Sequence, residues 1–384
     1  MKQKSSIVYV NFSPYDNAGR ILDFLCSTFD TVIHFSYDHL RLKNGRKTNI
    51  LTIYSHGHII EQKKLFPLRT PDYLRFFSLP GVAALILFQT LWYTYAYKPK
   101  HTPIDFYFSV NAYTAVIGVL MQSVRLIGES IFWVWDYYPP SYPDWRMMVL
   151  RRVYWRFDKP AIRSSSRLAF ISQKLITLRQ KLGVLKSGTR YKIIPIGTNP
   201  YSGKIKIKKK PIIGFLGMLK SSQGLDLLAK SLPTILTHHP DIRVEIIGSG
   251  PEEHEIRQRF KPWANVVTFY GYVEKEQVVD RIIRRWSMGI ATYLPEVYNE
   301  SYWADPSKIK AYLSQGVPVI TTNVPQFSKR ITSDKAGIVI LYEKNALINA
   351  VDRIIFRQTF FAKNAHALAQ KYMYKTLYRT FFTK

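Results

Sequence analysis

The chain has 384 residues, of which 47% are hydrophobic and 15% are aromatic. That length suffices for two domains with separate cores, and the composition excludes an intrinsically disordered chain. Lysine and arginine (55) outnumber aspartate and glutamate (26), a formal net charge of +29, which favours a polyanionic partner such as nucleic acid or an anionic membrane surface.

Cys26 is the only cysteine, which excludes an intramolecular disulfide and a cysteine-based metal site. It lies in a helical stripe with Ile21, Leu25 and Phe29, so we expect a buried structural thiol. The first residues run directly into a strand-like segment without the apolar core of a signal peptide, so we expect a cytoplasmic protein.

The first half of the chain alternates strand-like and helical segments, which predicts a parallel sheet covered on both faces. Helical patterns include residues 18–29 and 112–127. His56 and His58 follow the third strand without a nearby cysteine or carboxylate, and we interpret them as loop residues rather than metal ligands. The expected strands are residues 7–10, 31–35, 50–54, 106–110, 131–135 and 168–171.

Residues 79–97 form an uncharged, mostly apolar run of about the length that spans a bilayer. Pro80, Gln89 and Thr94 dilute it, and its tyrosines with Trp92 suit a membrane interface. We therefore expect a buried or interface-lying helix, with a spanning helix as the alternative. A basic, aromatic helix follows the Pro-Tyr loop that begins at residue 137.

A basic stretch after residue 200 suits a linker, and a second α/β series follows it. We expect helices over residues 224–236, 252–260 and 277–286, and a basic helical pattern over 362–382. The expected strands are residues 212–216, 243–247, 266–270, 288–292, 318–321 and 337–340. Two doubly wound domains follow from this pattern, with ligands expected in the cleft between them.

The run DPSKIKAYLSQGVPVITT, residues 305–322, encodes a helix start, a helix end and a strand. Asp305 is expected to cap the helix, Pro306 to take its first position, and Gly316 to end it. A helix start that opens into a crevice suits a phosphate, because it presents free N–H groups and a partial positive charge. An ordinary α/β crossover has the same spacing.

This run and five segments upstream or downstream of it resemble the signature segments of GT-B glycosyltransferases, family 4 in particular, over roughly residues 190–345. The resemblance implies two Rossmann-like domains that face a cleft. The implied divisions are an acceptor-side domain (1–197), a nucleotide-sugar domain (198–361) and a C-terminal helix that returns to the first domain (362–384). The five segments are IIPIGTN, GFLGMLKSSQGLDLL, IIGSGPEEHEI, VTFYGYV and AGIVI.

The resemblance places donor binding at two points. The loop that carries Gly217 lets backbone amides approach a diphosphate. Relatives carry basic residues at the positions of Met218 and Gln223, and in this chain Lys220 lies between those two positions. The helix start supplies the second point. Its candidate donor-binding residues are Asp305, Ser307 and Lys308.

The chain departs from the family where relatives carry a ribose-binding carboxylate, because Ala311 stands there and Trp303 replaces its companion. The nearest acidic candidates are Glu296, to which we assign a catalytic role, and Glu300, to which we assign donor binding. A surface charge in a loop is the alternative for either residue.

In the first domain, IFWVWDYYPP aligns with a strand that ends in a His-Asp pair in many relatives. Trp135 takes the histidine position and Asp136 the aspartate position, which makes Asp136 a catalytic candidate, with a loop cap as the alternative. Asn111, at the end of another strand, is a weaker acceptor-side candidate.

The resemblance implies a retaining, hexosyltransferase-like enzyme that moves a sugar from a nucleotide-diphosphate sugar to an acceptor hydroxyl. No Asp-x-Asp pair is present, so we expect no metal and no other cofactor. The basic, aromatic first domain favours a lipid-linked or cell-envelope glycan acceptor and a peripheral position on the inner face of the cell membrane.

Two other function classes remain. Ala311, Met218 and Gln223 together support a catalytically inactive GT-B-like partner protein. A nucleic-acid binder rests on charge alone, since no helix-turn-helix, zinc or RNP-type motif supports it, and we expect no specific nucleic acid as partner.

Overall fold

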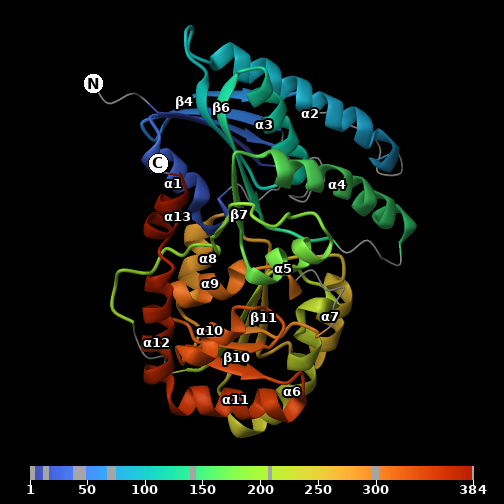
Figure 1. Cartoon of the computed structure of the whole chain (residues 1–384). Coiled ribbons are helices and arrows are strands. Elements are labelled where there is room, and N and C mark those ends of the chain that lie inside the picture. Colours follow the sequence, from blue (N-terminus) through green and yellow to red (C-terminus); the bar gives the residue numbers. More distant parts are fainter. Residues whose placement is uncertain are drawn as a thin grey trace. The chain divides into compact units, whose positions relative to one another are not determined.

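The computed structural model describes residues 5–11, 17–37, 49–66, 75–138, 144–205, 210–295 and 302–382. The chain divides into two compact units, Met1–Pro195 and Ile196–Lys384, called unit 1 and unit 2 below. Figure 1 labels their helices and strands. The last helices, α12 (Gln358–Lys371) and α13 (Tyr374–Phe382), fall in unit 2. The expected return of residues 362–384 to the first domain stays a prediction.

The described part of unit 1 forms an eight-stranded sheet in the order β4-β3-β2-β1-β5-β6-β7-β8. Its strands are β1 (Ser6–Asn11), β2 (Thr31–Ser36), β3 (Ile50–Ser55), β4 (His58–Lys64), β5 (Ile104–Ser109), β6 (Ile127–Val134), β7 (Arg167–Phe170) and β8 (Lys192–Ile193). Its helices are η1 (Ala18–Arg20), α1 (Ile21–Thr28), α2 (Arg75–Tyr97), α3 (Ala112–Ser123), α4 (Trp145–Ser164) and α5 (Gln173–Lys181).

The central strands of unit 1 are buried along nearly their whole length, as expected for parallel strands covered on both faces. One core cluster joins Val8 and Phe35 of the sheet to Ile86 of α2 and Ile117 of α3. Figure 1 shows α2, α3 and α4 grouped on one side of this unit. The thiol of Cys26 in α1 is half-buried, and burial raises its pKa to about 12, so it stays protonated at neutral pH.

The prediction of an all-parallel first sheet was wrong at one edge, because β3 pairs antiparallel with both β2 and β4. His56 and Gly57 make the two-residue turn between β3 and β4, with φ values of 48° and 80°. Two consecutive positive φ angles match the right-handed twist of a tight hairpin. His58, expected in a loop, is the first residue of β4.

The pattern of residues 112–127 was too long as a helix, since α3 ends at Ser123 and Ile127 opens β6. The apolar run 79–97 forms most of α2, which begins before it. Among the described residues, the segment Phe76–Tyr97 is long and apolar enough to cross a membrane; its most apolar 18-residue stretch has a mean hydropathy of 1.5 and is only 17% buried. Of the expected settings for this segment, the buried helix is therefore wrong, and the interface-lying helix and the spanning alternative stay predictions.

The described part of unit 2 forms a six-stranded parallel sheet in the order β11-β10-β9-β12-β13-β14. Its strands are β9 (Ile212–Leu216), β10 (Arg243–Ile247), β11 (Val267–Gly271), β12 (Met288–Ala291), β13 (Val319–Thr322) and β14 (Gly337–Ile340). Besides α12 and α13, its helices are η3 (Ser221–Gln223), α6 (Leu225–His238), α7 (Glu253–Phe260), η4 (Lys261–Trp263), α8 (Glu276–Ile283), α9 (Ser307–Ser314), α10 (Ser328–Ser333) and α11 (Lys344–Phe356).

Two core clusters cover the opposite faces of the second sheet. One includes Phe215 of β9 with Leu228 of α6 and Val351 of α11. The other includes Tyr312 of α9 with Leu368 of α12. Helices on both faces of a parallel sheet make unit 2 doubly wound, as predicted.

A buried ion pair fixes the end of β6 in unit 1. Nε of Arg179 in α5 lies 2.8 Å from Oδ2 of Asp158 in α4, and both side chains are 0% exposed. Nη2 of Arg179 also donates to the carbonyl oxygen of Asp136, at 3.2 Å. Burial raises the pKa of Asp158 and the Arg179 charge opposes that shift. The pair therefore joins two helices to the backbone that carries Asp136.

Asp158→Asn should lower the free energy of unfolding by about 3–5 kcal/mol, because it leaves the Arg179 cation buried without a counter-charge. Urea denaturation measures the loss. Glu253→Gln, which breaks the exposed Arg257–Glu253 pair, is the matched control and should lose less than about 1 kcal/mol. Equal, small losses in both variants would contradict the structural role of the buried pair.

Candidate functional site

The strand order of unit 2 gives a switch point at the carboxyl end of β9, and this place is called the crevice below. The neighbours of β9 are β10 on one side and β12 on the other, so the chain leaves β9 toward one sheet edge and β12 toward the opposite edge. Open α/β sheets bind ligands at such a switch point, beyond the carboxyl ends of the strands. The Thr292 hydroxyl after β12 donates to the Gly224 carbonyl oxygen before α6, at 3.1 Å, which ties the two flanking segments together.

Close packing at the end of β9 requires glycine at two positions. Gly217 has a φ of 146°, and a Cβ added to it would lie 2.7 Å from the Lys308 amine. A Cβ on Gly248 would lie 1.9 Å from the Gly217 carbonyl oxygen. The Gly217 amide donates to Ile247 O at 2.9 Å and the Leu219 amide donates to Ser249 O at 3.0 Å. Those two amides are thus engaged within the protein, and a ligand there would meet other groups of the loop.

The helix that follows β12 does not start as predicted. Pro306, not Asp305, is the residue at the cap of α9, and no side chain caps this end. The Asp305 carboxylate instead accepts the Ile196 amide at 2.7 Å and lies 3.4 Å from the Lys310 amine. The capping prediction was wrong because these buried partners hold the carboxylate away from the helix start. Its assignment to donor binding stays a prediction.

Lys310 is buried with Asp305, at 2% side-chain exposure. Its amine lies 3.7 Å from the ring centre of Phe327 and 3.9 Å from that of Tyr372. Burial lowers the pKa of Lys310 to about 8, although the Asp305 charge opposes this. Lys310 therefore anchors α9 to Asp305, Phe327 and Tyr372.

Lys308 is the buried cation of the crevice. Only 9% of the residue is exposed, and its amine donates to the side-chain oxygen of Gln223 at 2.6 Å. The amine also lies 4.3 Å from the ring centre of Phe215. Burial and, secondarily, the charge of Lys220 lower the pKa of Lys308 to about 7. No carboxylate of the described residues forms an ion pair with this amine, so within that part of the chain its charge is not balanced by an acidic side chain.

The structure brings Gly217, Lys220, Gln223 and Lys308 together at the crevice. Lys220 is half-buried and precedes η3. Ser307 is exposed at the first position of α9, beside Lys308. The predicted residues Glu296 and Glu300 lie outside the described residues. Ala311 packs against the apolar cluster on its face of the sheet, so it offers no polar group there.

The two candidates in unit 1 lie after neighbouring strands. Asp136 is exposed just beyond β6, and its carboxylate accepts the Tyr138 hydroxyl at 3.3 Å. Asn111 follows β5 at the switch point of this sheet, and its side-chain oxygen accepts the Tyr113 amide at 2.9 Å. Asn111 is therefore the N-cap of α3, which gives it a structural role. Its acceptor-side assignment and the catalytic assignment of Asp136 stay predictions.

Sequence reasoning missed the partner of Lys308 and the burial of Lys310. Gln223 was noted only as a departure from the family pattern, whereas its amide oxygen accepts the Lys308 amine. The two residues are 85 positions apart, so no local pattern joins them. The sequence shows Lys308 and Lys310 beside the apolar stripe of α9, which indicates two charges on this helix but does not indicate that both are buried.

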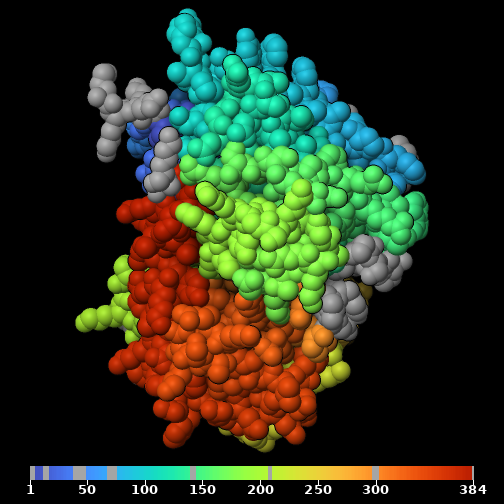
Figure 2. All heavy atoms as spheres, in the orientation of Figure 1, coloured from blue at the N-terminus to red at the C-terminus, as the bar shows by residue number. Residues whose placement is uncertain are grey.

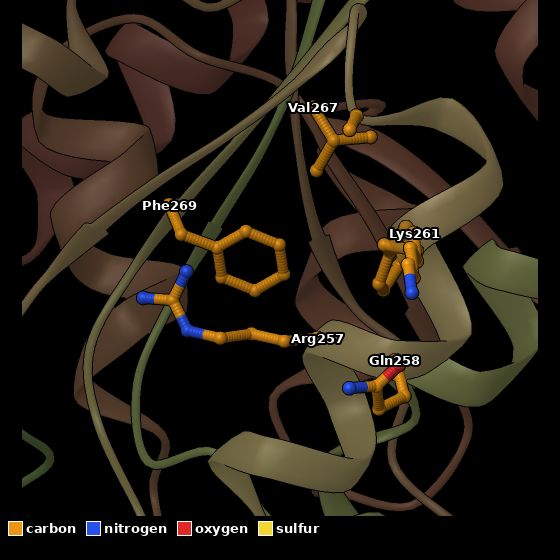
Figure 3. Close-up of a pocket in the computed structure, with 7 residues that line it drawn as sticks. Arg257, Gln258, Lys261, Val267 and Phe269 are labelled. Atoms are coloured by element: carbon orange, nitrogen blue, oxygen red, sulfur yellow. The ribbon is translucent and has the colours of Figure 1, made fainter.

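Two further observations bound the chemistry. Among the described residues, no group of three or more His, Cys, Asp or Glu side chains lies together as a metal site; the expected metal independence stays a prediction. A hollow of about 340 Å³ lies beside edge strand β11, lined by Arg257, Lys261 and Phe269 among others. Figure 3 shows the Arg257 guanidinium against the Phe269 ring, 4.4 Å from its centre, and Arg257 also pairs with Glu253. This hollow contains none of the predicted residues.

Residues 210–356, which include this crevice, match the family model described as "Glycosyl transferases group 1". No curated protein matches the chain. Solved structures that resemble it include the following three.

Sucrose-phosphate synthase from Thermosynechococcus elongatus has a TM-score of 0.70 and 16% identity, over 97% of this chain and 96% of that one. Trehalose-6-phosphate synthase OtsA has a TM-score of 0.68 and 12% identity, over 99% and 98%. Anabaena HepE in complex with UDP and glucose has a TM-score of 0.65 and 15% identity, over 98% of both chains. The predicted GT-B fold and the resemblance to glycosyltransferases are thereby confirmed, and family and fold together support a transferase.

Lys308→Met should change how stability depends on pH. The folded pKa of Lys308, about 7, lies below its ordinary value of 10.5, so its unfavourable contribution is complete below pH 7 and fades as the pH rises toward 10.5. The free energy of unfolding of the wild type should therefore rise, relative to that of the variant, by up to about 1.4 kcal/mol per pH unit in this window. Urea denaturation of both proteins at about pH 6, 8 and 9.5 measures the gain.

Lys344→Met, at an exposed position of α11, is the matched control for the loss of a lysine. The same pH dependence in both variants would show that the Lys308 amine is not the buried group the structure gives.

Proposed function

We propose that the protein is a glycosyltransferase that moves a sugar, a hexose by preference, from a nucleotide-diphosphate sugar to a lipid-linked or cell-envelope glycan acceptor. One observation carries the proposal: the Lys308 amine is buried beside Gly217 at the switch point of unit 2, and no carboxylate of the described residues pairs with it. A dianionic diphosphate is the ligand that would supply the opposite charge. The family model over residues 210–356 supports this choice.

The leaving diphosphate is the group that most needs stabilisation in such a transfer. The acceptor oxygen bonds to the anomeric carbon, the bond from that carbon to the β-phosphate oxygen breaks, and the acceptor proton passes to the departing phosphate. Negative charge grows on the diphosphate as the bond breaks, and fixed cations stabilise it without reorganisation. Lys308 and Lys220 occupy positions suited to that role, and the exposed start of α9 adds its partial positive charge.

Lys308 also makes donor binding a proton-coupled event. Burial lowers the pKa of Lys308 to about 7, into the neutral pH range. A bound diphosphate raises the pKa of a neighbouring amine, because it stabilises the charged form. Binding in this pH range would therefore take up protons.

We extend the proposal to a retaining, metal-independent mechanism, with the lysines in place of a cation. Asp136, at the end of β6, is the candidate to orient the acceptor or the sugar. The solved HepE structure holds UDP and glucose, which makes UDP-glucose the first donor to test. The basic, apolar surface of unit 1 supports the proposed acceptor class and the proposed peripheral site on the inner membrane face.

The second candidate is a GT-B-like partner protein without transferase activity. It is favoured by Ala311, which packs in an apolar cluster where relatives carry a carboxylate. Gln223 is weaker support for it than the sequence indicates, since this side chain holds Lys308 in place. Binding of a nucleotide sugar separates the two candidates.

Titration calorimetry near pH 7 with UDP-, GDP- and ADP-sugars should find one donor that binds. Lys308→Met and Lys220→Met should each weaken that donor about tenfold or more, because each removes a charged contact to the diphosphate. Lys344→Met is the matched control and should bind as the wild type does. If no nucleotide sugar binds, the inactive partner protein is favoured. If a donor binds to both lysine variants with the affinity of the wild type, the two lysines are not the diphosphate ligands.

A further inference from the structure

Helix α2 of unit 1 buries polar side chains beside its apolar core contacts and also exposes aromatic side chains on its outer face. Gln89, Thr90 and Thr94 are buried, with exposed fractions of 6%, 0% and 0%. The Gln89 amide donates to the Phe66 carbonyl oxygen at 2.9 Å, and Thr90 shares a hydrogen bond of 3.1 Å with the Tyr37 hydroxyl. These bonds fix which face of α2 points at the protein.

The opposite face of α2 is apolar and exposed. Phe77, Phe88, Trp92 and Tyr95 are each between 59% and 70% exposed. Their spacing of 11, 4 and 3 residues keeps them on one side of the helix. Phe88 and Trp92 stack with ring centres 6.3 Å apart. Exposed apolar side chains gathered in this way mark an interaction surface, whereas scattered ones do not.

Helix α4 extends this surface. Phe76 of α2 packs edge-to-face on Trp145 of α4, at 5.6 Å between ring centres, and Figures 1 and 2 show the two helices side by side in unit 1. At the start of α4, Trp145, Met147 and Val149 are 55%, 40% and 36% exposed. The apolar face of α2 thus continues onto the first turns of α4.

The exposed charge within α2 and α4 is positive, and the exposed Asp144 that caps the start of α4 is an acidic residue beside it. Helix α2 contains no acidic residue after Arg75, and the only acidic residue of α4, Asp158, is buried in its ion pair with Arg179. The Arg146 guanidinium lies over the Trp145 ring and the Lys98 amine over the Tyr95 ring, both 5.6 Å from the ring centre. The exposed cations of α4 are Arg146, Arg152, Arg156, Lys159 and Arg163.

We propose that this α2–α4 surface, made of the outward aromatic residues of α2 with the apolar start and the cations of α4, docks on the face of an anionic lipid bilayer. Aromatic rings enter the headgroup boundary while arginine and lysine contact anionic lipid, which is the pairing that membrane interfaces favour. A solvated protein partner does not require exposed aromatic side chains along the length of one helix together with exposed cations on the next.

The same contacts favour a helix α2 that lies on the bilayer over one that crosses it. A crossing α2 would have to release the hydrogen bonds of Gln89 and Thr90 and carry the buried Thr94 into hydrocarbon, where unpaired polar groups are costly. Its core contact through Ile86 would also be lost. The proposal rests on the proposed function only for its biological setting, since lipid binding needs no substrate.

Cosedimentation with phosphatidylcholine vesicles, with and without roughly one third phosphatidylglycerol, tests the surface. The wild type should bind the anionic vesicles at about 0.05 M salt, at least about tenfold more tightly than the neutral ones. Phe88→Ala/Trp92→Ala should weaken this binding about tenfold or more, since it removes two aromatic rings from the interface. Arg146→Gln/Arg152→Gln/Arg156→Gln should do the same and reduce the salt dependence.

Two matched controls come from unit 2. Phe356→Ala removes a side chain that is 89% exposed, and Lys275→Gln/Arg281→Gln/Lys344→Gln removes three exposed cations; both should bind vesicles as the wild type does. Circular dichroism and thermal melting check that every variant is folded. Equal loss in test and control variants, or no vesicle binding at all, would overturn the proposal. So would self-association through α2, seen as a dimer in light scattering that Trp92→Ala abolishes, without vesicle binding.

A failure here leaves the transferase testable, because nucleotide-sugar binding to unit 2 is measured without lipid. Conversely, vesicle binding without any nucleotide-sugar affinity would keep the docking surface and remove the proposed reaction.

Discussion

The burial of Lys308 is the constraint on which the candidate site depends. An amine in that position is desolvated, and its charged form is tolerated only with compensating groups. The protein supplies an amide oxygen from Gln223 and the face of Phe215, but no carboxylate of the described residues. Gly217 adopts a φ of 146°, which strains other residues, and a Cβ there would lie 2.7 Å from this amine. The buried cation thus accounts for the buried glutamine and for the suitability of the crevice for an anion.

Most strands of unit 2 were predictable because each is a short apolar run between turn residues. β9, β10 and β14 match the predicted ranges, and β13 differs by one residue at each end. In unit 1 the same apolar pattern did not distinguish parallel from antiparallel pairing, which depends on the connection and not on the strand. The His56-Gly57 turn was the local sign of a hairpin, and its two positive φ angles became visible only in the structure.

The chemistry of the site was predictable only in part. Gly217 and Lys308 followed from the resemblance, and the structure places them in contact distance. The roles of Asp305 and Lys310 did not follow, because helix-start patterns consider only neighbours in sequence, whereas the partners of these residues lie at Ile196, Phe327 and Tyr372. Polar residues of α2 likewise face inward against the usual pattern, because their partners come from Tyr37 and Phe66.

The bond between Asp305 and the Ile196 amide has a structural consequence. Ile196 is the first residue of unit 2, at the point where the chain passes out of unit 1. Asp305 stands three residues before Lys308, and Lys310 clamps it from within the same helix. The backbone at the junction is therefore bonded, through one buried carboxylate, to the segment that opens α9. The chain that enters unit 2 and the helix that carries Lys308 thus share a buried polar contact, although Ile196 and Asp305 are 109 residues apart.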